Sequence, residues 1–312
     1  MNEEKNLTLE KAFNLALQNP ENNLEVAEDF CKEILKKKPN HFQANFFLGI
    51  LSALNKKFDI AKQLLNKATE IDPDNSDAHN NLGNVLKQIG EHQKAKNCYK
   101  KSIQIQPNNA PLHNNLGSVL EELGEHQKAK SCYEKAIQIQ PSYLMVLNNL
   151  GNLLKELGEY QKAKSCYEKI ILIQPSHVSA INNLGNVLGK LEEYKKAISC
   201  YDEAIKINPN YFLAHNNKGV ILQKLRKFNE SLKSYNSAFK INPNYNFLIG
   251  KVVYTKSCLC DWESFDENLN SLKDKLNNNE ASSLPFATLS LYDLPLLQKK
   301  AAEVWIKKNI FK

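Results

Sequence analysis

Paired asparagines are the side chains whose type and spacing most suggest a binding surface. The pairs recur every 34 residues, at Asn80/Asn81, Asn114/Asn115, Asn148/Asn149, Asn182/Asn183 and Asn216/Asn217. Asparagine is a poor helix former, so five pairs inside segments of helical pattern need a reason. A carboxamide offers donors and an acceptor, which suits an extended polypeptide backbone whatever its side chains are. We predict a peptide-binding groove lined by the second asparagine of each pair: Asn81, Asn115, Asn149, Asn183 and Asn217.

A second interpretation of the same amides stays open. They could cap turns or bond one another between helices, and duplication of the repeat would then have copied this structural role into each repeat. We favour this structural role for the first asparagine of each pair and the groove for the second.

Cysteines and histidines, which could bind metals or form disulfides, follow the same step. One repeat position carries Cys98, Cys132, Cys166 and Cys200, and another carries His79, His113 and His215. Residues one repeat apart are too distant for a disulfide or a zinc cluster. Cys258 and Cys260 lack the CxxC spacing and a nearby histidine. We therefore predict reduced packing thiols, histidines at the groove edge or in packing, no metal and no cofactor.

The elements that must position these side chains are helix pairs. Glycines from Gly49 to Gly219 and prolines from Pro39 to Pro243 both recur every 34 residues, which marks a solenoid built from one repeated unit. Within 76–109, apolar residues at helical spacing predict two helices joined at Gly90 and closed by Pro107. Tyr99 is expected to fill the gap between units. The period predicts seven units, at 8–41, 42–75, 76–109, 110–143, 144–177, 178–211 and 212–245.

This pattern resembles the tetratricopeptide repeat, with Leu-Gly in the first helix, alanine and an aromatic in the second, and a closing proline. The fold class predicted is all-α, a tetratricopeptide-repeat superhelical solenoid with a short helical C-terminal extension. The first unit is degenerate, with Leu15 in place of glycine and Cys31 in place of the aromatic. In the last unit Lys218 and Ser231 replace apolar residues, so looser packing is expected there.

Composition limits the partners. The formal net charge of +7 comes almost wholly from lysine, because Arg226 is the only arginine. Nucleic-acid readers commonly use the bidentate fork of arginine, so we expect proteins or extended peptide segments as partners and no nucleic acid. The first ten residues contain no apolar run, and no stretch reaches the length of a membrane span. We expect no membrane association and a cytoplasmic location. The oligomeric state is left open.

Residues 246–312 are predicted to hold a capping helix and then a different kind of segment. The segment carries Cys260-Asp261-Trp262, Ser282-Ser283, Pro285-Phe286 and the stretch Gln298 to Trp305. In order and spacing it resembles the join between repeats and catalytic region in the O-linked N-acetylglucosamine transferase and SPINDLY-type glycosyltransferase family. The resemblance implies sugar transfer from a nucleotide-sugar donor to serine or threonine of proteins, with the groove holding the acceptor.

The residues after the seventh unit are too few for the two nucleotide-binding lobes of such an enzyme. We therefore predict a protein-interaction module without catalytic residues, the substrate-recognition half of a protein O-glycosyltransferase. The alternatives are a fragment of an active O-GlcNAc or O-fucose transferase, and a generic scaffold that binds through its convex face. The tail from about Leu284 is expected to be frayed, folded back on the last repeat or paired with another chain.

Overall fold

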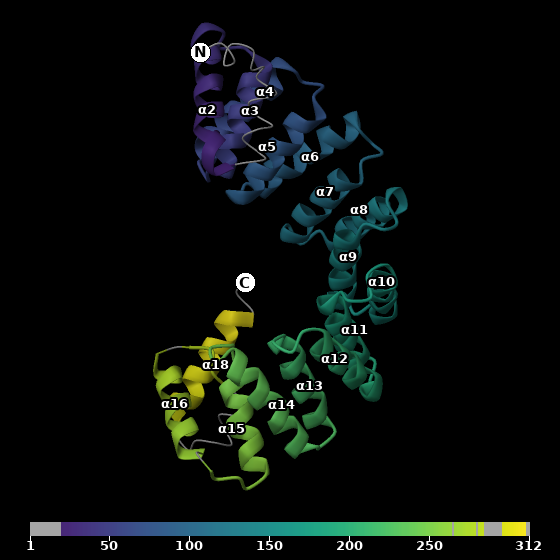
Figure 1. Cartoon of the computed structure of the whole chain (residues 1–312), viewed down its shortest axis with the longest axis vertical. Helices are drawn as coiled ribbons and strands as arrows, with labels where there is room; N and C mark the ends of the chain where they lie inside the picture. The colour runs from purple at the N-terminus through teal and green to yellow at the C-terminus, as the bar shows by residue number, and fades with distance from the viewer. Residues whose placement is uncertain (1–19, 264, 279, 284–294, 310–312) are drawn as a thin grey trace. The chain divides into compact units, whose positions relative to one another are not determined.

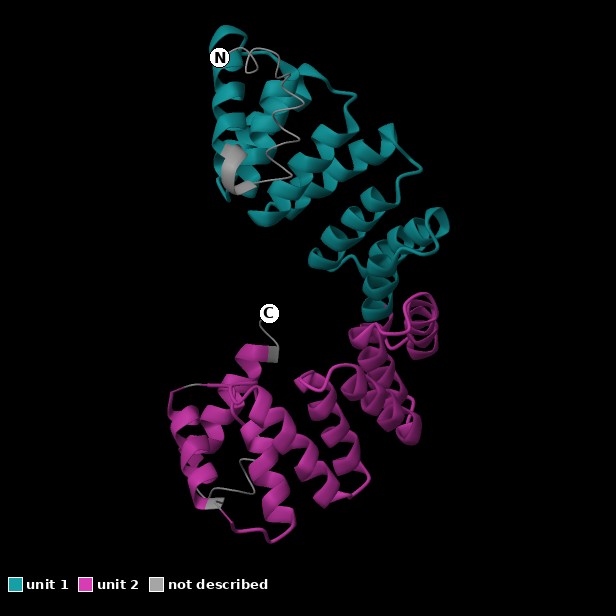
Figure 2. Ribbon diagram, in the orientation of Figure 1, with its two compact units in different colours: residues 1–153 teal, residues 154–312 magenta. Residues whose placement is uncertain are grey.

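The computed structural model describes residues 20–263, 265–278, 280–283 and 295–309, and all the regular structure in these ranges is α-helical (Figure 1). The all-α prediction is confirmed for this part of the chain. Two compact units are present, residues 1–153 and 154–312 (Figure 2). Helix α9 straddles the boundary between the two units.

Each projected unit from 42 to 245 contains a first and a second helix. The first helices are α3 (Phe42–Leu54), α5 (Ser76–Gln88), α7 (Ala110–Glu122), α9 (Leu144–Glu156), α11 (Val178–Lys190) and α13 (Phe212–Lys224). The second helices are α4 (Phe58–Ile71), α6 (His92–Ile105), α8 (His126–Ile139), α10 (Tyr160–Ile173), α12 (Tyr194–Ile207) and α14 (Phe228–Ile241). Helix α2 (Pro20–Lys37) precedes them, and α15 (Leu248–Cys258), α16 (Phe265–Asn277) and α18 (Pro295–Asn309) follow.

Local signals set where these helices begin and turn. The side chain of Asn75 accepts the Ala78 N–H at 3.0 Å and so caps α5. The turn between first and second helix contains one residue of left-handed backbone, which is glycine at Gly90, where φ is +80°. Glu192 holds the same place with φ 61°, so the turn forms even where the residue is not the favoured glycine.

The core of a helix pair is an aromatic ring laid on a glycine. Tyr133 of α8 is fully buried, and a Cβ added to Gly117 of α7 would lie 2.6 Å from its ring. The same contact joins Gly83 to Tyr99, Gly185 to Tyr201 and Gly219 to Tyr235. The tyrosines therefore fill the space within a pair. Tyr201 also shares a buried cluster with Ala214 and Ile221 of the following repeat, and the expectation that Tyr99 fills the gap between units stays a prediction. The ring needs the space that only a glycine leaves on the facing helix.

The expectation of looser packing in the last repeat is wrong, because α13 and α14 contact each other as closely as the helices of the other pairs do. Ser231 is fully buried and donates to the carbonyl of Gly219 at 2.8 Å. Lys218 lies 2.6 Å from a carboxylate oxygen of Asp202, so its charge is paired at the surface. Both polar replacements are satisfied by partners that the alanine and the leucine of other units do not need.

The helices after the repeats form a small packed group. Leu297 and Ala301 of α18 share a buried cluster with Leu272 of α16 and with Ile249 and Val253 of α15. Residues 295–309 thus pack on α15 and α16, which follow the last repeat, whereas the alternative given above was folding back on the last repeat itself. The expectations that rest on Leu15, Pro285 and Phe286 lie outside the described residues, as does the rest of the tail.

Gly117→Ala tests the ring-on-glycine contact. Helix propensity alone would make alanine more stable by about 1 kcal/mol. We expect the opposite, a loss of about 1–3 kcal/mol in the free energy of unfolding, because the added Cβ must displace the Tyr133 ring. Urea unfolding followed by circular dichroism measures the change, with the exposed Ser131→Ala as control. A more stable Gly117→Ala protein would contradict this account.

Candidate functional site

The predicted site lies on the face formed by the first helices. In the compact unit 1–153, α3 contacts α5 and α5 contacts α7, and in the compact unit 154–312, α11 contacts α13. Residues at the same repeat position on successive first helices are therefore neighbours within each compact unit. We call this surface the first-helix face.

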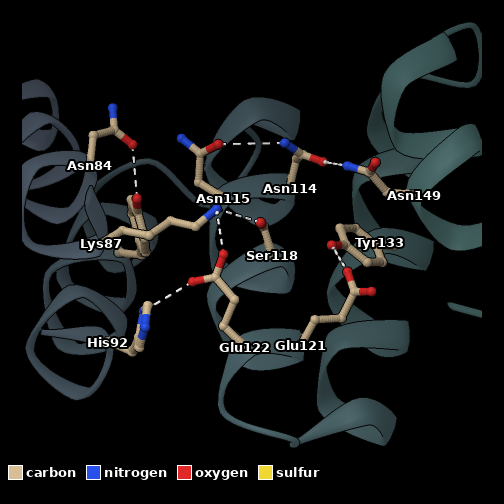
Figure 3. Close-up of polar contacts among 11 residues, drawn as sticks. Asn84, Lys87, His92, Asn114, Asn115, Ser118, Glu121, Glu122, Tyr133 and Asn149 are labelled. Atoms are coloured by element: carbon tan, nitrogen blue, oxygen red, sulfur yellow. Dashed lines mark hydrogen bonds and ion pairs between the residues drawn. The ribbon is translucent and has the colours of Figure 1, made fainter. Parts of the chain in front are cut away.

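The asparagine pairs bond to one another across this face, forming an amide ladder. In each case Nδ2 of a second asparagine donates to Oδ1 of the first asparagine of the preceding repeat. The distance is 3.0 Å from Asn115 to Asn80, from Asn149 to Asn114 and from Asn217 to Asn182. Figure 3 shows Asn149 and Asn114 pointing toward each other. The structural role left open by the sequence is thus present.

The ladder leaves hydrogen-bonding capacity on the second asparagine. Asn217 donates one N–H to Asn182 and accepts one from Asn216 at 3.0 Å. A carboxamide has two N–H groups and two acceptor lone pairs, so one of each stays unused by these bonds. Asn216 is only 4% exposed, whereas Asn217 is half-buried, so the remaining capacity is on the more accessible partner.

The other two predicted site residues make different contacts. Asn81 donates to the carbonyl of Asp77, one turn earlier in its own helix, at 2.8 Å. Asn183 is half-buried and lies within 3.5 Å of Asn182 as acceptor. The structure therefore places the five predicted residues on the first helices, three of them in bonds between repeats. Their role in binding stays a prediction.

Sequence reasoning missed the residue that continues the ladder. Lys251 of α15 lies one 34-residue step after Asn217, and its Nζ donates to Oδ1 of Asn216 at 2.8 Å. The ammonium is also 5.8 Å from the ring centre of Tyr235, and it has no carboxylate partner among the described residues. Burial lowers its pKa to about 8. Extending the register by one step would have found it.

Buried tyrosines hold polar side chains on the same face. The hydroxyl of Tyr99 donates to Oδ1 of Asn84 at 2.8 Å, and that of Tyr133 donates to Glu121 (Figure 3). Burial raises the pKa of Tyr99, so the hydroxyl keeps its proton at neutral pH. Each tyrosine thus fixes an amide or a carboxylate at the first-helix face from inside the core.

Charges are paired around α5 and α7. Lys87 donates to Ser118 at 2.6 Å and lies 3.3 Å from Glu122, which also approaches His92 at 3.0 Å (Figure 3). In this network the ammonium of Lys87 and the carboxylate of Glu122 already have partners within the chain.

Two hollows open on the first-helix face, one in each of the two compact units. The apolar hollow, between α3 and α5, encloses about 390 Å³. It is lined by Ile50, Ala53, Leu54, Lys56, Phe58, Leu65, Asn81, Asn84, Val85 and Gln88. The cationic hollow, in the second unit, encloses about 450 Å³. It is lined by Lys155, Asn186, Gly189, Lys190, Tyr201, Asn217, Val220, Ile221 and Lys224. Volumes of this order accommodate small ligands or side chains.

The histidines and cysteines have structural contacts. Nε2 of His79 lies 2.9 Å from the carbonyl of Pro73, and His113 and His215 repeat the contact with Pro107 and Pro209. None of the seven cysteines forms a disulfide, and burial raises the pKa of the Cys98 thiol to about 11. Within the described ranges, no cluster of three or more histidine, cysteine, aspartate or glutamate side chains could hold a metal. No helix in those ranges combines the length and apolar character needed to cross a membrane.

Comparison with known families decides the nature of the repeats. A model described as TPR repeat matches residues 55–90, and models described as tetratricopeptide repeat match 74–142, 108–176, 178–211 and 212–245. The matches together cover more than half of the chain. The chain belongs to the tetratricopeptide-repeat family. No curated protein matches it.

Solved structures of tetratricopeptide-repeat proteins are similar. YrrB, described as a TPR protein with an unusual peptide-binding site, is 23% identical, with a TM-score of 0.52 over 59% of this chain and 95% of its own. PilF of Pseudomonas aeruginosa is 22% identical, with a TM-score of 0.55 over 64% and 90%. The C-terminal part of a repeat protein from Cytophaga hutchinsonii is 16% identical, with a TM-score of 0.64 over 78% and 99%. At these identities the likeness shows the fold.

Lys251→Met tests the buried ammonium. The folded pKa of about 8 lies below the ordinary value of 10.5, so between these pH values the unfolded state binds more protons. The free energy of unfolding contributed by Lys251 should therefore rise as pH increases from about 8 to about 10.5, by about 1–3 kcal/mol. The variant lacks this term, so the wild type should gain stability relative to it over that range. Titrating tyrosines are common to both proteins and cancel in the difference.

Urea unfolding at several pH values from neutral to 10.5 measures this difference, and the exposed Lys240→Met serves as the matched control. Parallel pH profiles for wild type and Lys251→Met would show that the folded pKa is not depressed.

Proposed function

We propose that the chain is a protein-interaction module that holds extended polypeptide segments along its first-helix face. The observation that carries the proposal is the amide ladder, because it repeats backbone-like donors and acceptors at a regular step. An extended peptide presents N–H and C=O groups at regular intervals, so a row of carboxamides can bind it with little regard to sequence.

The hollows add a place for side chains beside this row. Asn81 lines the apolar hollow and Asn217 lines the cationic hollow, so in each unit a predicted amide borders a space large enough for a side chain. In peptide recognition, hydrogen bonds to the peptide backbone commonly supply affinity, and pockets that receive peptide side chains supply specificity. The description of YrrB as a peptide-binding TPR protein is consistent with this use of the fold.

The test is capture of unstructured peptides by the full chain. A displayed library is enriched on the wild-type protein, and the affinities of selected peptides are measured by fluorescence anisotropy. Asn115→Ala with Asn149→Ala should weaken binding about 10-fold, because two hydrogen bonds of about 0.5–1.5 kcal/mol each are lost. Asn81→Ala extends the test to a residue that bonds only within its own helix, so its loss leaves the ladder intact.

The controls address the convex-face scaffold. Lys94, Lys128 and Lys162 are exposed on second helices, each paired with a glutamate three residues earlier. Charge reversal at these lysines should change peptide affinity less than about 2-fold. If the lysine variants abolish capture, and the asparagine variants keep wild-type affinity and helicity, binding is on the convex face and the ladder is structural.

A second candidate function rests on the C-terminal resemblance. The segment from Cys260-Asp261-Trp262 to the stretch ending at Trp305 favours the substrate-recognition part of a protein O-glycosyltransferase, with the acceptor held on the first-helix face. Such an enzyme would use a nucleotide sugar. Mass spectrometry of acceptor peptides incubated with the chain and UDP-N-acetylglucosamine or GDP-fucose tests whether this chain itself transfers sugar. Sugar transfer would show that the chain is an active enzyme and not only an interaction module.

A further inference from the structure

We propose that the cationic hollow binds a side-chain carboxylate of an acidic, partly aliphatic segment. The hollow lies between α11 and α13, and the inference rests on the proposed function because it specifies which extended segments the first-helix face selects. Three features carry it: lysines without carboxylate partners among the described residues, an oriented amide donor, and a matched hollow of opposite chemistry.

Two lysines at the edge of the hollow lack carboxylate partners. Lys190 and Lys224 are both exposed, and neither forms an ion pair among the described residues. Lys224 instead lies 5.9 Å from the ring centre of Tyr194. No aspartate or glutamate is among the described residues that line the hollow. An acidic group entering it would meet two cations whose charge nothing within the described chain neutralises.

Two carboxylates in the turn after α11 and on α12 already have lysine partners. Glu193 lies 3.6 Å from Lys164, and Asp202 lies 2.6 Å from Lys218. A third lysine, Lys155, also lines the hollow, and burial lowers the pKa of its ammonium. A carboxylate from outside would stabilise the charged form of this group. The field in the hollow is therefore positive and favours an anionic ligand.

An amide is oriented to donate beside the lysines. Oδ1 of Asn186 accepts the hydroxyl of Tyr201 at 2.9 Å, which fixes the direction of the carboxamide. Its Nδ2 makes no hydrogen bond to the described residues, so it is a donor available to a ligand. Burial raises the pKa of Tyr201, so this hydroxyl stays a donor and the orientation holds at neutral pH.

The inner wall of the hollow is apolar. Ile221 packs over Gly189, where an added Cβ would lie 2.8 Å from Cδ1 of the isoleucine, and Val220 lies beside it. A glutamate or aspartate carboxylate could reach the lysines while an adjoining aliphatic side chain covers Val220 and Ile221. This pairing of charge with apolar area defines the segment expected.

The apolar hollow shows that the fold does not require this chemistry. Eight of its lining positions are those of the cationic hollow four repeats earlier in the sequence. There Leu54 and Gln88 stand where the cationic hollow has Lys190 and Lys224, and Ile50 stands in place of Asn186. Equivalent helix positions thus carry either uncharged or cationic side chains. The stacking of the repeats therefore does not require the charge of Lys190 and Lys224.

The experiment compares two fluorescent peptides that differ only in charge, Ser-Glu-Leu repeats and Ser-Gln-Leu repeats, binding to the full chain. The acidic peptide should bind more tightly. Lys190→Gln with Lys224→Gln should reduce its affinity about 10-fold at low ionic strength and less at physiological salt, while changing binding of the neutral peptide less than about 2-fold.

Matched variants separate the hollow from net charge. Lys169→Gln with Lys195→Gln removes the same charge from exposed positions on second helices and should leave the acidic peptide bound as in the wild type. Leu54→Lys with Gln88→Lys, added to the Lys190/Lys224 variant, should restore preference for the acidic peptide by rebuilding the lysine pair in the apolar hollow.

The outcomes distinguish the two proposals. Equal affinity for both peptides, lost on Asn217→Ala, would overturn the acidic preference while leaving segment binding intact. Binding of neither peptide would overturn both. Equal losses from the Lys169/Lys195 and Lys190/Lys224 variants would show a general charge effect and overturn the assignment to the hollow. A phosphoserine peptide that binds more than about 10-fold more tightly than the glutamate peptide would overturn the carboxylate in favour of phosphate.

Discussion

The contact between a second-helix tyrosine and a first-helix glycine sets the spacing of the helix pair. A Cβ at Gly117 or Gly185 would lie 2.6 Å from the facing ring, so the two backbones approach closely only because the glycine has no side chain. The ring buries a large apolar area at this point. Its hydroxyl then emerges at the first-helix face, where Tyr99 and Tyr201 hold Asn84 and Asn186. The same tyrosine therefore makes the packing contact and orients a polar side chain at the surface.

The amide ladder depends on that spacing. Successive first helices are neighbours within each compact unit, so the second asparagine of one repeat meets the first asparagine of the preceding repeat. A buried polar group is costly without a partner, and Asn114 and Asn182 are almost fully buried, so each needs the amide of the following repeat. Lys251 meets the same need for Asn216 where the repeats give way to α15. Repeats that match at this position thus stack without orphaned polar groups.

Differences between repeats, rather than the repeat itself, give the surface its chemistry. Leu54 and Lys190 occupy equivalent places in two hollows, and the helices beneath them start and end at equivalent positions. In a solenoid each unit contacts only its neighbours, so a surface side chain can change in one unit without disturbing the others. Binding preferences can therefore differ along one chain that has a uniform core.

The sequence by itself determined the period, the helix pairs and the repeat family, because glycines, prolines and apolar spacing act over a few residues. It also located the asparagine pairs on the first helices. Only the tertiary structure decided that Asn115 bonds to Asn80, that Tyr99 lies on Gly83, and that residues 295–309 fold back onto α15 and α16. These partners are separated by 16 to 52 residues in the sequence. Which side chains meet across such distances depends on how whole helices pack, and local propensity does not encode that. Location in the cytoplasm and any link to sugar transfer stay predictions, since neither follows from packing.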